Sequence, residues 1–431
     1  MVVRFLTLGC KLNFAETSSI AHALSEHGHR RANTGEEAQL CIVNTCSVTD
    51  QADRKDRQAI HRLKRENPNA IIIATGCYAQ LKAEADTASD NCIDGVDYIV
   101  GNGDKQSIID LVDHLSQATD VRPYAVARPM REVQNFNHAV SYTDTDEQIT
   151  DRSQRTRSFL KVQDGCNYFC TYCTIPFARG RSRNPAIREL ATQAQKAIDG
   201  GAHEIVLTGV NIADFGQSTN ESFIDLLRAL DELKGDYRLR IGSCEPNLLS
   251  DQIIDFVAAA QHIAPHFHLP LQSGSNRMLE IMHRRYTREL FAQRVEHIRN
   301  VMPQAFIGVD CMVGVRGETD ELFSDYLTFV QNLDVSQLHV FTYSERAKTR
   351  MLNMDLYVVP HHERKQRSDI MHRLSDDKLK AFYHRNKGTQ HTVLWEGHAQ
   401  NGLMKGFTEN YILTTAPFQP DKVNTFEQIR L

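Results

Sequence analysis

Apolar runs alternate with amphipathic stretches along the first part of the chain. The apolar runs have the continuous character of parallel strands that are covered on both faces. They are residues 3–8, 40–43 and 70–74. Helical periodicity fills residues 15–27 and 54–66 between them, and Asn67 with Pro68 ends the second stretch. This alternation predicts a doubly wound α/β domain over residues 1–115.

A second series of strands and helices follows a polar segment, residues 116–150, which we interpret as a linker. The apolar runs of this series are residues 158–162, 204–208, 238–242, 266–271, 306–312 and 337–342. Helical stretches between them include residues 185–199, 222–233 and 318–332. Right-handed crossovers place every helix on one side of such a sheet, so the sheet must curve. Six strand–helix units are fewer than the eight of a closed barrel, and they predict a partial (β/α)6 barrel over residues 151–387.

The last part of the chain changes character. Residues 361–387 predict a surface helix that Gly388 ends, and this helix completes the barrel domain. Residues 388–431 alternate apolar and polar positions, which predicts a small C-terminal β module.

Composition restricts the class of protein. The chain has 431 residues, 41% hydrophobic and 24% charged, with a net charge of -5. No apolar run reaches the ~18 residues of a membrane span, and the first ten residues do not resemble a signal peptide. We therefore expect a cytoplasmic protein without membrane contact. Ten cysteines in a cytosolic chain favour metal binding or thiol chemistry over disulfides.

Three cysteines lie close together after the first predicted strand of the second series: Cys166, Cys170 and Cys173. Ligands at this spacing on one loop can turn toward one metal centre, and thiolates favour iron–sulfur clusters or zinc. Three thiolates bind only three irons of a four-iron cluster and leave the fourth free for a substrate. The end of a parallel strand is also where such folds place active sites. A zinc site completed by a distant His or Cys is the alternative.

A second set of cysteines is dispersed in the sequence. Cys10, Cys46 and Cys77 each come just after one of the three predicted strands of the first domain. Because those loops converge at the carboxyl edge of a doubly wound sheet, we expect the three thiols to be neighbours that hold a second metal centre. Taken singly, each cysteine is more often a small buried hydrophobe, and the shared strand-end position is what favours a metal centre. We assign that packing role to the other four: Cys41, Cys92, Cys244 and Cys311.

These cysteines stand in longer motifs. The CxxxCxxC, with Tyr172 before its last cysteine, resembles the radical S-adenosylmethionine superfamily. The three strand-end cysteines in front of it resemble, more narrowly, the methylthiotransferases. The matching motifs are Gly9-Cys10-Lys11-Leu12-Asn13, Asn44-Thr45-Cys46-Ser47-Val48-Thr49, Gly76-Cys77-Tyr78-Ala79-Gln80, residues 175–183, residues 268–275 and Gly317-Glu318-Thr319. The resemblance spans about residues 1–350.

The resemblance implies two four-iron, four-sulfur clusters and S-adenosylmethionine. One cluster, on Cys166, Cys170 and Cys173, would cleave S-adenosylmethionine to a deoxyadenosyl radical. The other, on Cys10, Cys46 and Cys77, would hold the sulfur that is transferred. An external electron donor and a sulfur source are also implied. Expected cofactor contacts are Tyr172, Gly209, Asn211 and Glu245.

The resemblance also implies a substrate, which is a tRNA base beside the anticodon. Lys11 and residues 54–58 resemble the branch that modifies C2 of N6-threonylcarbamoyladenosine. Isopentenyladenosine in tRNA and a ribosomal protein side chain are alternative targets of the same chemistry. A non-catalytic iron–sulfur RNA-binding protein is the alternative of another class.

Departures from the family pattern concern the second half of the chain. Arg316 replaces the usual proline before Gly317, and Lys348 and Arg350 replace small residues. The C-terminal segment is short for a TRAM domain, which predicts a reduced, TRAM-like module.

Basic residues beside the cysteine loop support an RNA substrate. Arginines suit phosphate contacts, and unpaired anticodon-loop bases stack on aromatic rings. The arginines expected to contact RNA are Arg179, Arg181, Arg183, Arg284 and Arg285.

Overall fold

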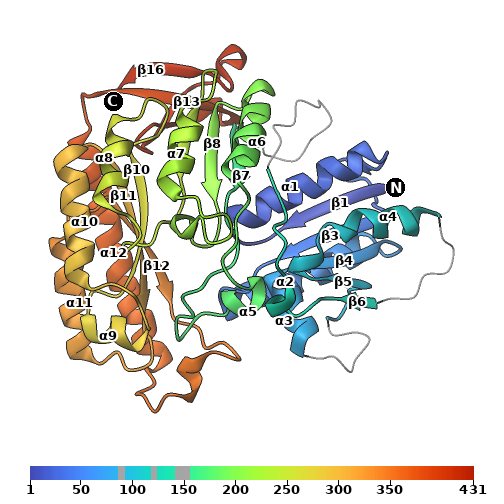
Figure 1. Cartoon of the computed structure of the whole chain (residues 1–431), viewed down its shortest axis with the longest axis horizontal. Coiled ribbons are helices and arrows are strands. Elements are labelled where there is room, and N and C mark those ends of the chain that lie inside the picture. The colour runs from blue at the N-terminus through green and yellow to red at the C-terminus, as the bar shows by residue number, and fades with distance from the viewer. Residues whose placement is uncertain (86–92, 118–123, 141–155) are drawn as a thin grey trace.

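The first part of the chain folds around a parallel sheet (Figure 1). The computed structural model describes residues 1–85, 93–117, 124–140 and 156–431. The strands are β1 (Val2–Thr7), β2 (Arg30–Arg31), β3 (Leu40–Thr45), β4 (Ile71–Gly76), β5 (Tyr98–Val100) and β6 (Tyr124–Val126). The helices are α1 (Lys11–Glu26), α2 (Asp50–Glu66), α3 (Cys77–Ala85) and α4 (Ser107–Gln117). Six strands pair in the order β2-β1-β3-β4-β5-β6, so the chain reverses its direction across the sheet between β1 and β3.

Helices cover both faces of this sheet. Ile20 of α1 and Leu111 of α4 pack with inward residues of the strands on one face. Ile60 of α2 and Tyr78 of α3 pack on the other. The predicted doubly wound α/β domain is confirmed.

Two regions of this domain differ from the sequence-based prediction. The short strands β2 and β5 escaped detection because two or three residues carry too little periodicity to be recognised. Residues 124–126, inside the predicted linker, pair with β5 as strand β6, and a 3-10 helix, η2 (Met130–Glu132), follows them. Cys92 and residues 141–150 of the predicted linker lie outside the described residues.

The second part of the chain is a curved row of six parallel strands with helices on its outer side (Figure 1). The strands are β7 (Arg157–Lys161), β8 (Glu204–Thr208), β9 (Arg238–Ile241), β10 (His266–Gln272), β11 (Phe306–Val313) and β12 (Gln337–Thr342). The helices are α5 (Ile175–Arg179), α6 (Ile187–Asp199), α7 (Phe223–Asp231), α8 (Asp251–Ala259), α9 (Asn276–Ile281), α10 (Arg288–Val301), α11 (Asp320–Asn332) and α12 (His361–Arg385).

The six strands form two ladders, β7-β8-β9 and β10-β11-β12. Single parallel bridges, Leu239 with Ile263 and Ser243 with His268, join the ladders. The result is a partial (β/α)6 barrel, as the sequence predicts. One continuous apolar core lies between the strands and the outer helices, and it includes residues as far apart in sequence as Leu160 and Met371.

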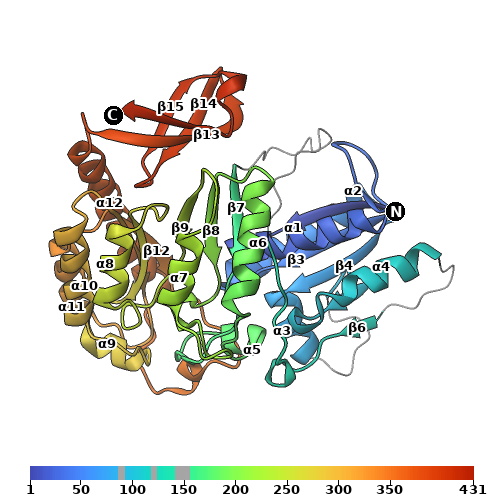
Figure 2. The ribbon, with the colours of Figure 1, turned by 45° about the horizontal axis from the view of Figure 1, so that its top comes forward.

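The C-terminal module is an antiparallel sheet that stands over one end of the barrel (Figure 2). Its strands are β13 (Gln390–Gln400), β14 (Leu403–Thr408), β15 (Leu413–Pro417) and β16 (Phe426–Arg430). They pair in the order β15-β14-β13-β16, which confirms the predicted small β module. The arginines of β9 attach it: Arg238 donates to the carbonyl oxygen of Phe407 (3.2 Å) and Arg240 to that of Glu409 (3.0 Å).

No helix within the described ranges is both long and apolar enough to cross a membrane.

Candidate active site

The three dispersed cysteines follow three neighbouring strands of the first sheet. Cys10 precedes α1, Cys46 follows β3, and Cys77 begins α3 directly after β4. The first two therefore flank the place where the chain reverses across the sheet, a preferred ligand position in such folds. Burial raises the pKa of the Cys46 thiol to about 12, and the thiols of Cys77 and Cys10 contribute to the shift. The structure thus brings the three sulfurs into one electrostatic neighbourhood.

Glycines make this convergence possible. Gly9 and Gly76 precede Cys10 and Cys77 and have positive φ angles of +94° and +98°. A Cβ on Gly9 would lie 2.7 Å from the sulfur of Cys46, and one on Gly76 would lie 2.3 Å from the carbonyl oxygen of Thr45. Only a glycine permits both the conformation and the close approach.

Cys166, Cys170 and Cys173 lie on the loop between β7 and α5. The loop is held internally and from the side. The backbone N–H of Cys173 donates to the carbonyl oxygen of Cys170 (3.1 Å), and the hydroxyl of Thr171 donates to that of Ile281 (2.8 Å). Burial raises the pKa of the Cys173 thiol, and the neighbouring thiols of Cys170 and Cys166 add to the effect. These three sulfurs are therefore neighbours as well.

The two cysteine loops meet at the domain interface. The hydroxyl of Thr174, next to Cys173, lies 3.4 Å from the carbonyl oxygen of Ser47, next to Cys46. The amide of Asn102 donates to the carbonyl oxygen of Ala178 in α5 (2.8 Å). Figure 1 shows α5 of the barrel domain beside α3 of the first domain.

A buried ion network lies beneath this contact. Arg179 of α5 pairs with Glu16 of α1 (3.0 Å) and with Asp164 of the β7 loop (3.1 Å). Lys105 and Lys161 also bind Glu16. Burial acts to raise the pKa of Glu16, but the charges of Arg179, Lys105 and Lys161 outweigh it and hold that pKa well below its usual range. The network therefore joins the two domains through ionised groups.

The expected cofactor contacts lie around the Cys166 loop. Asn211 is 2% exposed, and both polar atoms of its amide lack a hydrogen-bond partner among the described residues. Gly209 lies against Gln163, whose carbonyl oxygen would be 2.8 Å from an added Cβ. Glu245 forms an ion pair with Arg284, and the same guanidinium lies 3.5 Å from the hydroxyl of Tyr172.

These residues fit an iron–sulfur cluster with S-adenosylmethionine. Each cysteine set supplies three soft ligands on loops that meet, which is the donor chemistry that such a cluster takes. Burial raises the pKa of Cys166 to about 12, so metal binding must displace thiol protons. The unpaired amide of Asn211 offers both a donor and an acceptor to a polar ligand.

The arginines predicted to bind RNA divide into two groups. Arg181 and Arg285 are exposed, and each lies over an aromatic ring of the Cys166 loop, Phe169 (5.7 Å) and Tyr168 (4.2 Å) respectively. The side chains of the other three are buried and paired with carboxylates: Arg179, Arg183 and Arg284. An RNA phosphate cannot reach those guanidiniums without breaking the pairs, so we correct the prediction and keep it for the exposed two.

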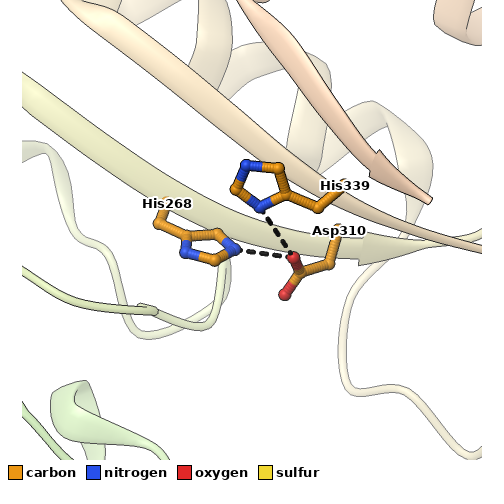
Figure 3. A group of neighbouring side chains, drawn as sticks. All are labelled: His268, Asp310 and His339. Carbon is orange, nitrogen blue, oxygen red and sulfur yellow. Dashed lines mark hydrogen bonds and ion pairs between the residues drawn. The ribbon is translucent and has the colours of Figure 1, made fainter. Parts of the chain in front are cut away.

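Sequence reasoning assigned no role to a polar group inside the barrel. His268 of β10 and His339 of β12 both face Asp310 of β11 (Figure 3), at distances of 2.6 and 3.4 Å. Their ligand atoms lie within 4.8 Å of one another, and two imidazoles with a carboxylate could hold a metal ion. The two imidazole contacts also satisfy the carboxylate without one. The signal that could have revealed the group is a polar residue at an inward position of three successive strands.

Cys41, Cys244 and Cys311 are buried, as their predicted packing role requires. Cys41 lies within the core of the first domain, and the other two lie within the barrel core.

Comparison with known proteins gives the arrangement a family. The family model described as uncharacterized protein family UPF0004 matches residues 2–101, and that of the radical SAM superfamily matches residues 160–330. A solved structure of a radical S-adenosylmethionine methyltransferase, TsrM from Kitasatospora setae, superposes with a TM-score of 0.58 at 16% identity. The match covers 79% of this chain and 74% of that one, and it shows a shared fold.

Relatives named as tRNA-modifying enzymes match over nearly the full length of the chain. A Bacillus subtilis (strain 168) protein named threonylcarbamoyladenosine tRNA methylthiotransferase MtaB is 34% identical, covering 100% of this chain and 93% of its own. A Finegoldia magna protein named tRNA-2-methylthio-N(6)-dimethylallyladenosine synthase is 30% identical, covering 95% and 87%. The resemblance seen in the motifs is confirmed, and the chain belongs to the methylthiotransferase family of radical S-adenosylmethionine enzymes, in the branch of the MtaB proteins.

Proposed function

We propose that this enzyme adds a methylthio group to C2 of N6-threonylcarbamoyladenosine beside the anticodon of tRNA. The observation that carries the proposal is the meeting of the two cysteine loops, at Thr174 and Ser47, in a chain whose MtaB-named relative is 34% identical over the full length. Two three-thiolate sites across one interface suit a reaction in which one centre activates the base and the other delivers sulfur. Family membership makes the chain an enzyme and excludes the non-catalytic RNA-binding alternative.

The cofactors are iron–sulfur clusters and S-adenosylmethionine, which together supply radical chemistry and a transferable methylthio group. We assign Cys166, Cys170 and Cys173 to the cluster that meets S-adenosylmethionine, and Cys10, Cys46 and Cys77 to the cluster that carries sulfur. Asn211 binds polar atoms of S-adenosylmethionine, and Gly209 and Tyr172 lie beside the same cofactor. The buried ion network around Arg179 holds the two loops together across the domain interface.

The partners follow from this chemistry. The tRNA anticodon loop binds over the exposed Arg181 and Arg285, and an external electron donor and a sulfur source serve the two clusters. All of these are available in the cytoplasm, which we propose as the location.

The test is an anaerobic assay with reconstituted enzyme and three tRNA preparations, which carry threonylcarbamoyladenosine, isopentenyladenosine or unmodified adenosine at the same position. Nucleosides from each are resolved by mass spectrometry. We expect the methylthio product only with the threonylcarbamoyl tRNA. Product from isopentenyl tRNA alone would move the chain to the specificity named for the Finegoldia magna relative. No product from any tRNA would refute a tRNA substrate.

Cysteine variants test the assignment of the two sites. Replacing Cys10, Cys46 and Cys77 together by alanine is expected to lower the iron content from about eight to about four per chain. Cys41→Ala is the matched control, because Cys41 is a buried thiol of β3 that lies in the apolar core. It should leave the iron content unchanged. An unchanged iron content in the triple variant would refute the second cluster.

A further inference from the structure

Each cysteine set has one buried arginine that donates to one of its sulfurs. Arg179 Nε lies 3.3 Å from the sulfur of Cys77, and Arg284 Nη1 lies 3.1 Å from that of Cys170. Both are shorter than the contacts that the backbone N–H of Tyr168 makes with Cys166 (3.4 Å) and the amide of Asn102 makes with Cys77 (3.9 Å). The sequence predicts that both arginines contact RNA, but their burial and carboxylate pairing call for another role.

Arg179 has little freedom at this position. Arg179 is 1% exposed. Its Nη1 donates to Glu16 (3.0 Å) and Asp164 (3.1 Å), and its Nη2 donates to Asn13 (2.8 Å) and to the second oxygen of Glu16 (3.2 Å). The remaining N–H, at Nε, points to Cys77. The carboxylate of Glu16 thus fixes the guanidinium from the side opposite the sulfur.

Arg284 repeats the arrangement at the other site. Its side chain is 3% exposed and forms an ion pair with Glu245. Its Nε donates to the hydroxyl of Tyr286 (3.1 Å), which itself donates to the carbonyl oxygen of Leu271 (2.9 Å). The order carboxylate, guanidinium, thiol therefore occurs twice, on unrelated elements of the fold.

A fixed cation beside a ligand sulfur has a definite electrostatic effect. Reduction adds negative charge to an iron–sulfur cluster, and hydrogen bonds to its sulfurs stabilise that charge. In a buried site this stabilisation is stronger than in water because the surroundings screen it less. A guanidinium cannot lose its proton at any pH that the protein survives, so the effect is permanent.

We propose that Arg179 and Arg284 are positioning residues that each donate a hydrogen bond to one cluster thiolate, Cys77 and Cys170 respectively, and so raise the reduction potential of that cluster alone. The inference rests on the proposed function, because it requires a cluster at each cysteine set. Under this proposal, one arginine sets the reduction potential of each cluster independently of the other. One electron donor can then reduce both clusters.

The first test detects the hydrogen bond from each arginine while that arginine and its cysteine set are intact. Protein is produced with ¹⁵N-guanidinium arginine and reconstituted in two forms, each of which lacks one cysteine set by alanine substitution. Pulsed electron paramagnetic resonance of the reduced cluster is expected to show a ¹⁵N coupling in both forms. Arg179→Lys should abolish it for the Cys10, Cys46 and Cys77 cluster, and Arg284→Lys for the other. Absence of coupling in both forms with their arginines intact would overturn the proposal.

The second test measures the reduction potential of each cluster by mediator-equilibrated titration. In the form that keeps only Cys10, Cys46 and Cys77, Arg179→Gln is expected to disfavour reduction about tenfold, a shift of about 59 mV to more negative potential. Arg179→Lys, which keeps the charge, should give a smaller shift and guards against misfolding of the Gln variant. In the same form, Arg284→Gln should cause no shift. The reciprocal pattern is expected in the other form.

Arg183→Lys is the matched structural control. Arg183 is buried and pairs with Asp164 of the same network (3.0 Å), but it donates to no cysteine sulfur in the hydrogen bonds of the described residues. It should leave both potentials unchanged. Equal shifts from Arg183 and Arg179 would mean that the network acts only by holding the fold, and would overturn the proposal. Four irons instead of eight in the parent protein would instead refute the proposed function.

Discussion

A buried amide without partners is costly at the scale of a single residue. Leaving a buried donor or acceptor unsatisfied costs about 1–3 kcal/mol, and neither the side-chain oxygen nor the side-chain nitrogen of Asn211 has a partner among the described residues. The backbone N–H of Asn211, in contrast, donates to the side-chain oxygen of Gln163 (2.8 Å). A bound polar ligand removes the cost, so the position stores binding energy for that ligand.

Asn211→Ala is therefore expected to weaken the binding of S-adenosylmethionine by about tenfold, corresponding to one lost hydrogen bond of about 1.4 kcal/mol. Iron content should not change, because no thiol is altered. Titration calorimetry of the reconstituted enzyme measures the dissociation constant of S-adenosylmethionine. Gln217→Ala, an exposed side chain on the same segment, serves as control. Equal affinity of the Asn211 variant and the parent would remove Asn211 from the cofactor site.

Glycine geometry makes a second prediction at this scale. Gly9→Ala places a methyl group 2.7 Å from the Cys46 sulfur and strains a backbone with φ of +94°. We expect the variant to lose about half of its iron, because the sulfur must move. Gly28→Ala has a similar strain, with φ of +80°, but its methyl group meets no atom of the described part of the chain within 4 Å. It should cost about 1 kcal/mol of stability and retain full iron. Full iron in the Gly9 variant would show that the site tolerates the displacement.

Some site residues were predictable from the chain alone, and the reason is local. Cys10, Cys46 and Cys77 each follow an apolar strand, and parallel strands end at one edge, so periodicity alone brings them together. The roles of Arg179 and Arg284 were not predictable in this way. From the sequence alone, an arginine is expected at the solvent-exposed surface. Only the tertiary structure shows that both arginines are buried, in ion pairs with Glu16 and Glu245.

At the scale of elements, the long periodic segments were predicted well and the short ones were missed. The observed β8 (Glu204–Thr208) and β12 (Gln337–Thr342) coincide with the predicted strands. The strand β2 pairs through only two residues, and its existence depends on β1 beside it. Within the predicted β module of residues 388–431, a turn separates β14 from β15. Tyr411 in this turn has a positive φ of +67°, and its ring stacks on that of Phe407. Such features depend on contacts that the local sequence does not encode.

One buried carboxylate of the barrel supports the attachment of the C-terminal sheet. Glu204, the first residue of β8, is 1% exposed and pairs with Arg238 and Arg240 of β9 (2.6 and 2.8 Å). Those arginines also donate to carbonyl oxygens of residues 407–409. Burial acts to raise the pKa of Glu204, but Arg240 and Arg238 outweigh it and hold that pKa well below its usual range.

Glu204→Gln leaves the buried guanidiniums without their counter-charge and is expected to destabilise the sheet and barrel contact by about 3–5 kcal/mol at pH 7. The folded-state pKa is depressed, so this stabilisation is present above about pH 4.5 and is lost as the pH falls toward the folded pKa. The difference between variant and parent should therefore shrink below pH 4.5.

Denaturant unfolding measures this difference through Trp395, the single tryptophan, which is buried in β13. Glu396→Gln, whose carboxylate is a half-exposed partner of Arg157, is the control and should cost less than about 1 kcal/mol. A constant difference between pH 7 and pH 4 would contradict the assigned ionisation of Glu204.

At the scale of the whole molecule, the charges divide into a buried set and an exposed set. The buried set joins the two domains: Arg346 of the loop after β12 pairs with Asp53 of α2 (2.7 Å) and donates to Ser47 (2.6 Å), near the contact of the two cysteine loops. The exposed set includes Arg181 and Arg285, both beside aromatic rings of the Cys166 loop. A chain with a net charge of -5 must attract RNA through such local features.

Arg181→Ala with Arg285→Ala is therefore expected to weaken tRNA binding and to reduce its dependence on salt. Each lost phosphate contact on a single-stranded loop lowers the slope of log affinity against log salt by about 0.7, so the double variant should lose about 1.4. Affinities are measured by fluorescence anisotropy over a series of salt concentrations with labelled tRNA. Arg373→Ala, exposed on the outer helix α12, is the matched control and should change neither affinity nor slope. If the double variant keeps the slope of the parent while the Arg373 variant lowers it, the RNA lies over the outer helices, and the proposed approach of the anticodon to the two cysteine loops is wrong.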